Sequence, residues 1–397
     1  MRARTHSGVE QTRHGRQGGG RWTRPSRRGR WGVALAGALL LASGIGHTPP
    51  VHAAGGVVGT GTAASCTTAA LDAALGGGGT VTFNCGGGPV TITDNLTISQ
   101  GTTLDGTGQQ VTIDGGGTGS VITVNSGVQF AVTNLTLTNG SNTVGGGIDN
   151  ASGRVTLTNS TVNGNSATAG GGIFNDDGTV TLINSTVSDN SVNGTGGGIF
   201  NVSGRVTLTN STVSGNSAGD LGGGGGIYNV SGTVTLGATI LVGNSASSGP
   251  DCFGALTSDD YNLIQDTSDC TIAGTTTHDI TGQDPHLGPL RNNGGATFTR
   301  ADDVNAAQPA VDAIPTSSGL CPSTDQRGFT RPDDAETTCD IGAYESGSGA
   351  SAPSTGPGPG PSATPELGSG ELLATGLLPL GLVILVRRRR ARRAVQP

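Results

Sequence analysis

The middle of the chain repeats a unit of about 25 residues, and this repeat limits the possible folds more than any other feature. A Gly-Gly-Gly-Ile run occurs four times, in steps of 25, 26 and 28 residues, starting at Gly145, Gly170, Gly196 and Gly224. A Val-Thr-Leu triplet follows each run at a constant offset, at Val155, Val180, Val206 and Val234. Because this offset does not change, the extra residues of the longer copies lie in the turn before each glycine run.

The pattern within one repeat predicts short β-strands. Apolar residues alternate with threonine over a few positions before Gly, Asn or Ser interrupts them, which indicates strands separated by turns. Helical repeats need longer apolar periodic segments, and propeller blades need about 40 residues. We therefore predict an all-β chain that forms a right-handed parallel β-helix, with three short strands per coil of about 25 residues.

Coils of a parallel solenoid stack about 4.8 Å apart, so equivalent residues form columns along its axis. Three such columns consist of asparagine: Asn150, Asn175, Asn201 and Asn229; then Asn159, Asn184 and Asn210; then Asn165, Asn190, Asn216 and Asn244. Asparagine tolerates left-handed turns, and stacked amides can bond between coils. We assign these columns a structural role.

Residues 54–249 are expected to form the β-helix together with an N-terminal cap. Leu71 and Leu75 lie four residues apart among good helix formers, and a strand over residues 80–83 follows. This arrangement resembles the start of pectin-lyase-like right-handed β-helices, in which a short helix covers the first coil. The coils themselves are similar to polymorphic outer-membrane protein repeats.

Charge is distributed unevenly along the chain. The sequence has no lysine, and 15 of its 21 arginines lie in residues 1–30 and 387–393. Residues 54–365 contain six arginines and 25 acidic residues, a formal charge of −19. Nucleic-acid binding needs clustered cations that neutralise phosphates, so we expect no nucleic-acid partner.

Residues 1–53 are predicted to be a signal peptide. Their Arg-rich start precedes a short apolar run, and Val51-His52-Ala53 places small residues where a signal peptidase cleaves. Cleavage is expected after Ala53. The Ser26-Arg27-Arg28 segment leaves twin-arginine export open as an alternative to general secretion, and the protein is exported by either route.

The C-terminal end is predicted to be a surface anchor. Residues 346–371 are a Gly/Pro/Ser linker unable to form a core. Residues 372–397 combine an apolar segment with an Arg-rich tail, which would hold that end in the cytoplasm. The segment from Leu372 to Gly376 loosely resembles a sortase motif, so both cleavage of the tail and its retention in the membrane stay open.

Six cysteines form three neighbouring couples, 19, 18 and 18 residues apart. An even number in an exported chain favours disulfides over metal ligands. The expected bridges are Cys66–Cys85, Cys252–Cys270 and Cys321–Cys339.

Residues 250–345 resemble the choice-of-anchor Q family. The resemblance rests on an ordered set of motifs: Asp260-Tyr261-Asn262-Leu263-Ile264, Asp284-Pro285-His286, Asn293-Gly294-Gly295, Asp325-Gln326-Arg327-Gly328 and Cys339-Asp340-Ile341-Gly342-Ala343-Tyr344-Glu345. The family implies an exported bacterial surface protein with no established chemistry, whose C-terminal region continues or caps the β-helix. Within that region we expect a capping ion-pair network of Asp325, Arg327, Arg331 and Asp340.

Asp176 and Asp177 are the candidate catalytic residues, because paired carboxylates supply the acid and base of glycoside hydrolysis. The pectin-lyase-like resemblance keeps a polysaccharide lyase or glycoside hydrolase open as an alternative. The Gly-His-Gly and Arg-x-Lys patterns of polygalacturonases do not occur in the sequence. We predict no cofactor and no metal site of fixed spacing; the acids after residue 250 leave a structural Ca²⁺ open.

The position after each repeated isoleucine is occupied by Asp149, Phe174, Phe200 and Tyr228. The isoleucines should face inward, so strand alternation directs this position outward. Three rings would then stack at about 4.8 Å intervals. Such a stripe, with acidic groups at its rim, suits sugar binding; an aromatic ladder that only stabilises the fold is the alternative.

We interpret the protein as a noncatalytic surface protein: a monomeric β-helix scaffold with an adhesive or glycan-binding role. Its partner would be an extracellular polysaccharide or another surface component. The alternatives are the enzyme described above and a structural spacer without a ligand.

The predicted boundary of the anchor can be tested by truncation. Deletion of residues 366–397 should release soluble protein whose melting curve is unchanged, because these residues lie beyond the predicted folded body. Calorimetry and cell fractionation would check this expectation, and loss of folding in the truncated protein would contradict it.

Overall fold

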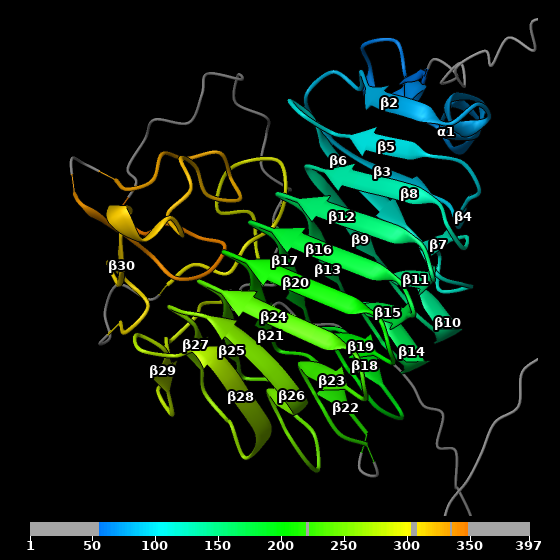
Figure 1. Cartoon of the computed structure of the whole chain (residues 1–397). Coiled ribbons are helices and arrows are strands. Elements are labelled where there is room, and N and C mark those ends of the chain that lie inside the picture. Colours follow the sequence, from blue (N-terminus) through cyan, green and yellow to red (C-terminus); the bar gives the residue numbers. More distant parts are fainter. Residues whose placement is uncertain (1–54, 220–221, 303–307, 334–335, 348–397) are drawn as a thin grey trace, which may run out of the picture. The chain divides into compact units, whose positions relative to one another are not determined.

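The computed structural model describes residues 55–219, 222–302, 308–333 and 336–347 and shows a stack of parallel strands (Figure 1). The predicted signal peptide, nearly all of the linker and the predicted anchor lie outside these residues. Within the described ranges, no helix is long and apolar enough to cross a membrane.

The solenoid has three main faces, each a parallel sheet to which successive coils contribute strands. The first face, here called the threonine arm, contains β1 (Val57–Val58), β2 (Gly79–Phe83), β5 (Thr102–Asp105), β8 (Gln129–Thr133), β12 (Arg154–Thr158), β16 (Thr179–Ile183), β20 (Arg205–Thr209) and β24 (Thr233–Gly237). The second face, the aromatic arm, contains β4 (Leu96–Ile98), β7 (Ile122–Val124), β11 (Ile148–Ala151), β15 (Ile173–Asp176), β19 (Ile199–Asn201) and β23 (Ile227–Asn229). The long strand β26 (Cys252–Asp259) pairs with β23, β24 and β28 (Asp269–Thr275), and so joins both arms into one sheet of 16 strands.

The third face, the covered face, is a separate sheet of nine strands. Its strands are β3 (Pro89–Thr93), β6 (Gln110–Asp114), β9 (Leu135–Thr138), β13 (Thr161–Asn163), β17 (Thr186–Ser188), β21 (Thr212–Ser214), β25 (Ile240–Val242), β27 (Leu263–Ile264) and β29 (Ile280–Thr281). Two smaller sheets contain β10 (Ser141–Val144), β14 (Ser166–Ala169), β18 (Ser191–Val192) and β22 (Ser217–Ala218), and the antiparallel pair β30 (Ile314–Pro315) and β31 (Thr338–Cys339). The 3₁₀ turns are η1 (Ala63–Ser65) and η2 (Thr316–Ser318).

The register of the strands confirms the predicted parallel solenoid. Ile148, Ile173, Ile199 and Ile227 are paired in sequence across the aromatic arm, and Val155, Val180, Val206 and Val234 across the threonine arm. These side chains are buried and belong to one continuous core cluster. Like therefore stacks on like, as the constant offset in the sequence requires.

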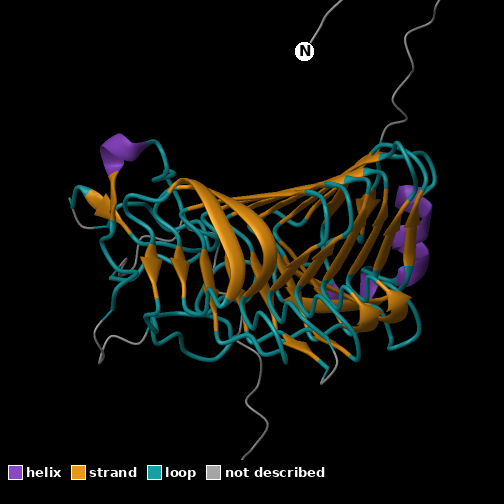
Figure 2. Cartoon of the chain, turned by 60° about the horizontal axis from the view of Figure 1, so that its bottom comes forward, coloured by secondary structure: helices purple, strands orange, loops and turns teal. Residues whose placement is uncertain are grey.

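The predicted N-terminal cap is present as α1 (Thr68–Leu75), the purple helix at the right-hand end of the strands in Figure 2. The Thr67 side chain accepts a hydrogen bond from the Ala70 amide, which satisfies one free donor at the helix start. Leu71 is fully buried against the core. The three disulfides of the structure join the neighbouring cysteines, Cys66–Cys85, Cys252–Cys270 and Cys321–Cys339.

The glycine runs are needed where coils approach each other closely. Gly170 adopts a left-handed φ of +64°, which L side chains rarely accept. A Cβ on Gly171 or Gly172 would lie only 2.6 Å from the carbonyl oxygen of Gly197 or Gly198 in the next coil. The triple glycine therefore permits backbone contact that any side chain would prevent.

Two of the three asparagine columns form buried amide ladders. In one, Asn165, Asn190 and Asn216 each donate from Nδ2 to Oδ1 of the next asparagine at 2.9 Å, and Asn244 donates to Asp251 at the same distance. In the other, Asn150, Asn175 and Asn201 donate in the same way at 2.7 to 2.9 Å, and Asn229 ends that ladder on the Ala255 carbonyl.

The column of Asn159, Asn184 and Asn210 differs from the ladders. These residues have left-handed φ angles of 50°, 46° and 48°. The Asn184 and Asn210 amides donate to the Thr324 and Leu320 carbonyls instead of to each other. This column therefore forms the turns and binds the C-terminal part of the chain.

That C-terminal part follows two paths. Strands β26 to β29 continue the solenoid, whereas the described residues between 287 and 345 return along the covered face. Contacts reach back to early coils: Gln110 donates to the Gly295 carbonyl, Thr161 to the Phe298 carbonyl and Thr186 to Gln326. The returning segment explains why Thr161, Thr186 and Thr212, which point away from the core, are nevertheless buried.

The amide ladder generates a stability prediction. Asn190→Ala removes the acceptor for the Asn165 amide groups and the donor to Asn216 and to the Val162 carbonyl. Buried polar groups without partners cost about 1–3 kcal/mol, so we expect unfolding free energy to fall by about 3 kcal/mol. Asn193→Ala, at an exposed turn, is the matched control. Equal chemical denaturation curves for the two variants would contradict the assignment.

Candidate functional site

One outward-facing row of the aromatic arm consists of aromatic residues with an aspartate beyond each end. Strand pairing places Asp149, Phe174, Phe200, Tyr228, Phe253 and Asp269 side by side in that order. We call the four rings of this series the aromatic row. An acidic residue occupies the position beyond each end of the row, so four rings lie between two carboxylates.

The rings contact each other in sequence but do not form a uniform stack. The ring centroids of Phe174 and Phe200 are 5.5 Å apart and those of Phe200 and Tyr228 5.3 Å, both with edge-to-face geometry. Tyr228 and Phe253 are parallel, with centroids 4.7 Å apart. The expected stacking of Phe174, Phe200 and Tyr228 was therefore wrong, because the quadrupoles of neighbouring rings favour edge-to-face contact where side chains can turn.

The rings are held by the backbone beneath them. Each follows a fully buried residue, Ile173, Ile199, Ile227 or Cys252, so strand alternation directs it away from the core. The left-handed glycine of each coil lies against the same position; a Cβ on Gly196 would lie 2.6 Å from the Phe200 Cβ. All four aromatic residues are half-buried, which fixes the rings and leaves part of each accessible.

Phe253 was missed by the sequence reasoning. Gly249 and Cys252 follow Gly224 and Ile227 by 25 residues, so the repeat continues for one more coil with Cys252 in place of isoleucine. This additional coil was overlooked because Ser-Gly-Pro-Asp, residues 248–251, stands where the preceding coil has its glycine run. The constant spacing was the signal that would have found this ring.

The two acidic residues selected from sequence, Asp176 and Asp177, have different surroundings. Asp176 is exposed at the end of β15. Asp177 adopts a left-handed φ of 55°, and its Oδ1 accepts a hydrogen bond from the Ser203 hydroxyl at 2.6 Å. Asp176 acts electrostatically on the carboxyl of Asp149, one coil earlier.

Asp149 has the more unusual environment. Its partial burial, and secondarily the charge of Asp176, raise the pKa of the Asp149 carboxyl. At the other end of the row, Asp269 is exposed and its Oδ2 accepts a hydrogen bond from the Gly249 amide at 2.7 Å. Both ends of the aromatic row therefore offer negative charge.

Positive charge lies on the neighbouring face. Arg154 and Arg205 are exposed at the starts of β12 and β20, two coils apart on the threonine arm. A groove of about 780 Å³ on that arm is lined by threonine, glutamine and glycine residues together with Arg154. This groove contains no acidic residue and is separate from the aromatic row.

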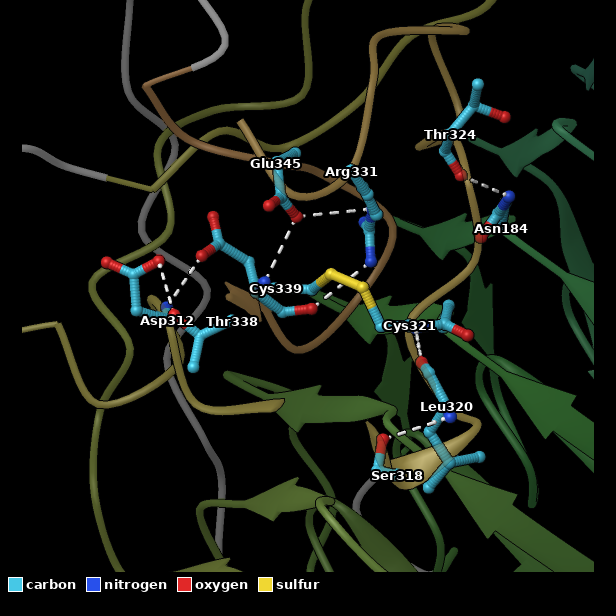
Figure 3. The surroundings of a disulfide bond; sticks show 12 residues. Asn184, Asp312, Ser318, Leu320, Cys321, Thr324, Arg331, Thr338, Cys339 and Glu345 are labelled. Carbon is cyan, nitrogen blue, oxygen red and sulfur yellow. Dashed lines mark hydrogen bonds and ion pairs between the residues drawn. A yellow bond between two sulfur atoms is a disulfide. The ribbon is translucent and has the colours of Figure 1, made fainter. Parts of the chain in front are cut away.

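The four residues expected to form an ion-pair network are buried in the returning segment. Arg327 pairs with Asp325 at 2.7 Å, and Arg331 donates to the carbonyls of Asp340 and Gly342. Sequence reasoning missed Glu345, whose carboxylate lies 3.3 Å from Arg331 near the Cys321–Cys339 disulfide (Figure 3). The network holds the segment together beside the covered face.

Within the described ranges, the carboxylates of Asp312, Asp333 and Glu336 lie within 4.8 Å of one another and are the group best placed to hold a cation. A hydrogen bond with Asp312 and its negative charge raise the pKa of Glu336 to about 7. A proton shared between these carboxyls satisfies the same geometry, so the cluster does not by itself indicate calcium.

No family model, curated protein or solved structure matches the chain.

The buried network generates a pH prediction. Burial, reinforced by the charge of Asp340, raises the pKa of Asp302 to about 8, and burial raises that of Glu345 to about 8. The folded protein thus binds these protons more tightly than the unfolded chain, so stability falls as pH rises from about 4 to about 8. Thermal melts of Asp302→Asn should show a smaller fall over this range than the parent protein.

The control for that experiment is Asp259→Asn, which neutralises an exposed aspartate. It should leave the pH dependence of the melting temperature unchanged. If both variants flatten the profile equally, general repulsion within the acidic body is the cause, and the assignment to Asp302 fails.

Proposed function

We propose that this protein is an exported, noncatalytic β-solenoid that binds an extended polysaccharide along its aromatic row. The observation that carries the proposal is the linear series of four half-buried rings, from Phe174 to Phe253, on consecutive parallel strands. Apolar ring faces suit the C–H faces of sugars, and the polar groups at the ends supply hydrogen bonds.

The scaffold suits such a role because it is rigid and linear. Each ring is fixed by a strand hydrogen-bonded on both sides, so little conformational freedom would be lost on binding. A chain lying parallel to the solenoid axis would meet one ring per coil. The three disulfides favour an oxidising environment, consistent with export.

The proposal includes the place of the protein at the cell surface. The motifs of residues 250–345 and the linker, apolar segment and Arg-rich tail that follow support membership of the choice-of-anchor Q family and attachment by the C-terminal end. An adhesive role follows if the bound polysaccharide belongs to another surface.

Binding to a panel of polysaccharides tests this function. Phe200→Leu keeps an apolar side chain but removes the central ring, and we expect it to weaken binding about tenfold, equivalent to ~1.4 kcal/mol. Affinity electrophoresis and pull-down with insoluble glycans measure the effect. The control is Ile183→Ala, which truncates an exposed apolar residue on the threonine arm.

Three outcomes would contradict the proposal. A lowered melting temperature of Phe200→Leu with unaltered glycan binding would make the row a purely structural ladder. Failure of the parent protein to bind any glycan would favour the spacer. New reducing or unsaturated ends would favour the lyase or hydrolase.

A further inference from the structure

We propose that the aromatic row is selective for a positively charged glycan, a polymer of amino sugars that carry free ammonium groups. This inference rests on the proposed function and assigns the class of ligand. It follows from the two kinds of group that the aromatic arm places together, rings and carboxylates.

Acidic side chains lie at both ends of the aromatic row. Asp149 and Asp269 occupy the same outward row as the rings, next to Phe174 and Phe253 in the strand register. Asp176 projects from the same strand as Phe174, two residues further along. A ligand that covers the row therefore meets carboxylates at both of its ends.

The Asp149 carboxylate lies in an unfavourable environment. Among the described residues it has no hydrogen-bond partner, and no cationic side chain forms an ion pair with it. It is half-buried and lies near the negative charge of Asp176. A bound ammonium group would offset both unfavourable effects, whereas an anionic or neutral sugar would not.

The chemistry of the rings also favours a cation. Aromatic faces attract cations, most strongly when the cation is partly desolvated. The rings follow one another with centroids 5.5, 5.3 and 4.7 Å apart, and the edge-to-face contacts of Phe200 with Phe174 and Tyr228 leave some ring faces uncovered by neighbouring rings. Ring faces and carboxylates thus favour the same charge, and the positive groups Arg154 and Arg205 belong to a different face.

The experiment compares two hexamers of β-1,4-linked glucosamine at pH 6 in low salt, one fully deacetylated and one fully N-acetylated. Isothermal titration should show at least tenfold tighter binding of the deacetylated hexamer to the full-length protein. Asp149→Asn and Asp269→Asn should each reduce this preference about threefold. Added salt should reduce it as well.

The controls separate this inference from the proposed function. Equal affinity for both hexamers overturns charge selection but leaves glycan binding intact. Loss of all binding in Phe200→Leu concerns glycan binding by the aromatic row and not the selection of charge. Asp259→Asn, exposed at the end of β26, should not change the preference. If it lowers the preference as much as Asp149→Asn, the attraction is a general effect of the acidic body and the inference is wrong.

Discussion

The hydrogen bonds between buried asparagine amides are the constraint on which the rest of the structure depends. A parallel sheet fixes the distance between coils but leaves the turns with polar groups that water cannot reach. Each ladder asparagine donates through Nδ2, and Asn190, Asn216 and Asn244 also accept, through Oδ1, from the asparagine of the preceding coil. A coil displaced by one residue would leave all these groups unsatisfied, so the ladders enforce the register of every outward row.

The polarity of these ladders also explains how they end. All side-chain amides of the Asn165 ladder donate in the same direction along the solenoid. The Nδ2 group of the last residue, Asn244, therefore needs an acceptor that is not part of the asparagine column. Asp251 supplies it with one oxygen and uses the other to accept the Asp266 amide. Burial raises the pKa of this carboxyl, while its hydrogen bonds oppose that effect. The same residue thus ends the repeat and attaches the coil that follows.

The sequence was sufficient to predict the coils because the repeat carries redundant information. Isoleucine, valine, glycine and asparagine recur with the same steps from coil to coil, and the structure pairs the residues that these steps align. The course of residues 287–345 could not be predicted in this way, since its contacts join residues more than 100 positions apart. The Thr161, Thr186 and Thr212 column has the pattern of an exposed surface, and only the returning segment buries it.

The candidate site could be predicted only in part for the same reason. A solenoid converts a one-dimensional repeat into a linear surface, so three of the four rings and the flanking Asp149 followed from one alignment. The C-terminal end of the aromatic row was not predicted, because the last ring-bearing coil keeps the spacing of the repeat but has different residues at the repeated positions. Cys252 replaces isoleucine and joins Cys270, which secures the last ring-bearing coil to the next strand. The disulfide therefore fixes Phe253 and Asp269 in adjacent positions, and the boundary of the aromatic row is set by covalent chemistry as well as by strand pairing.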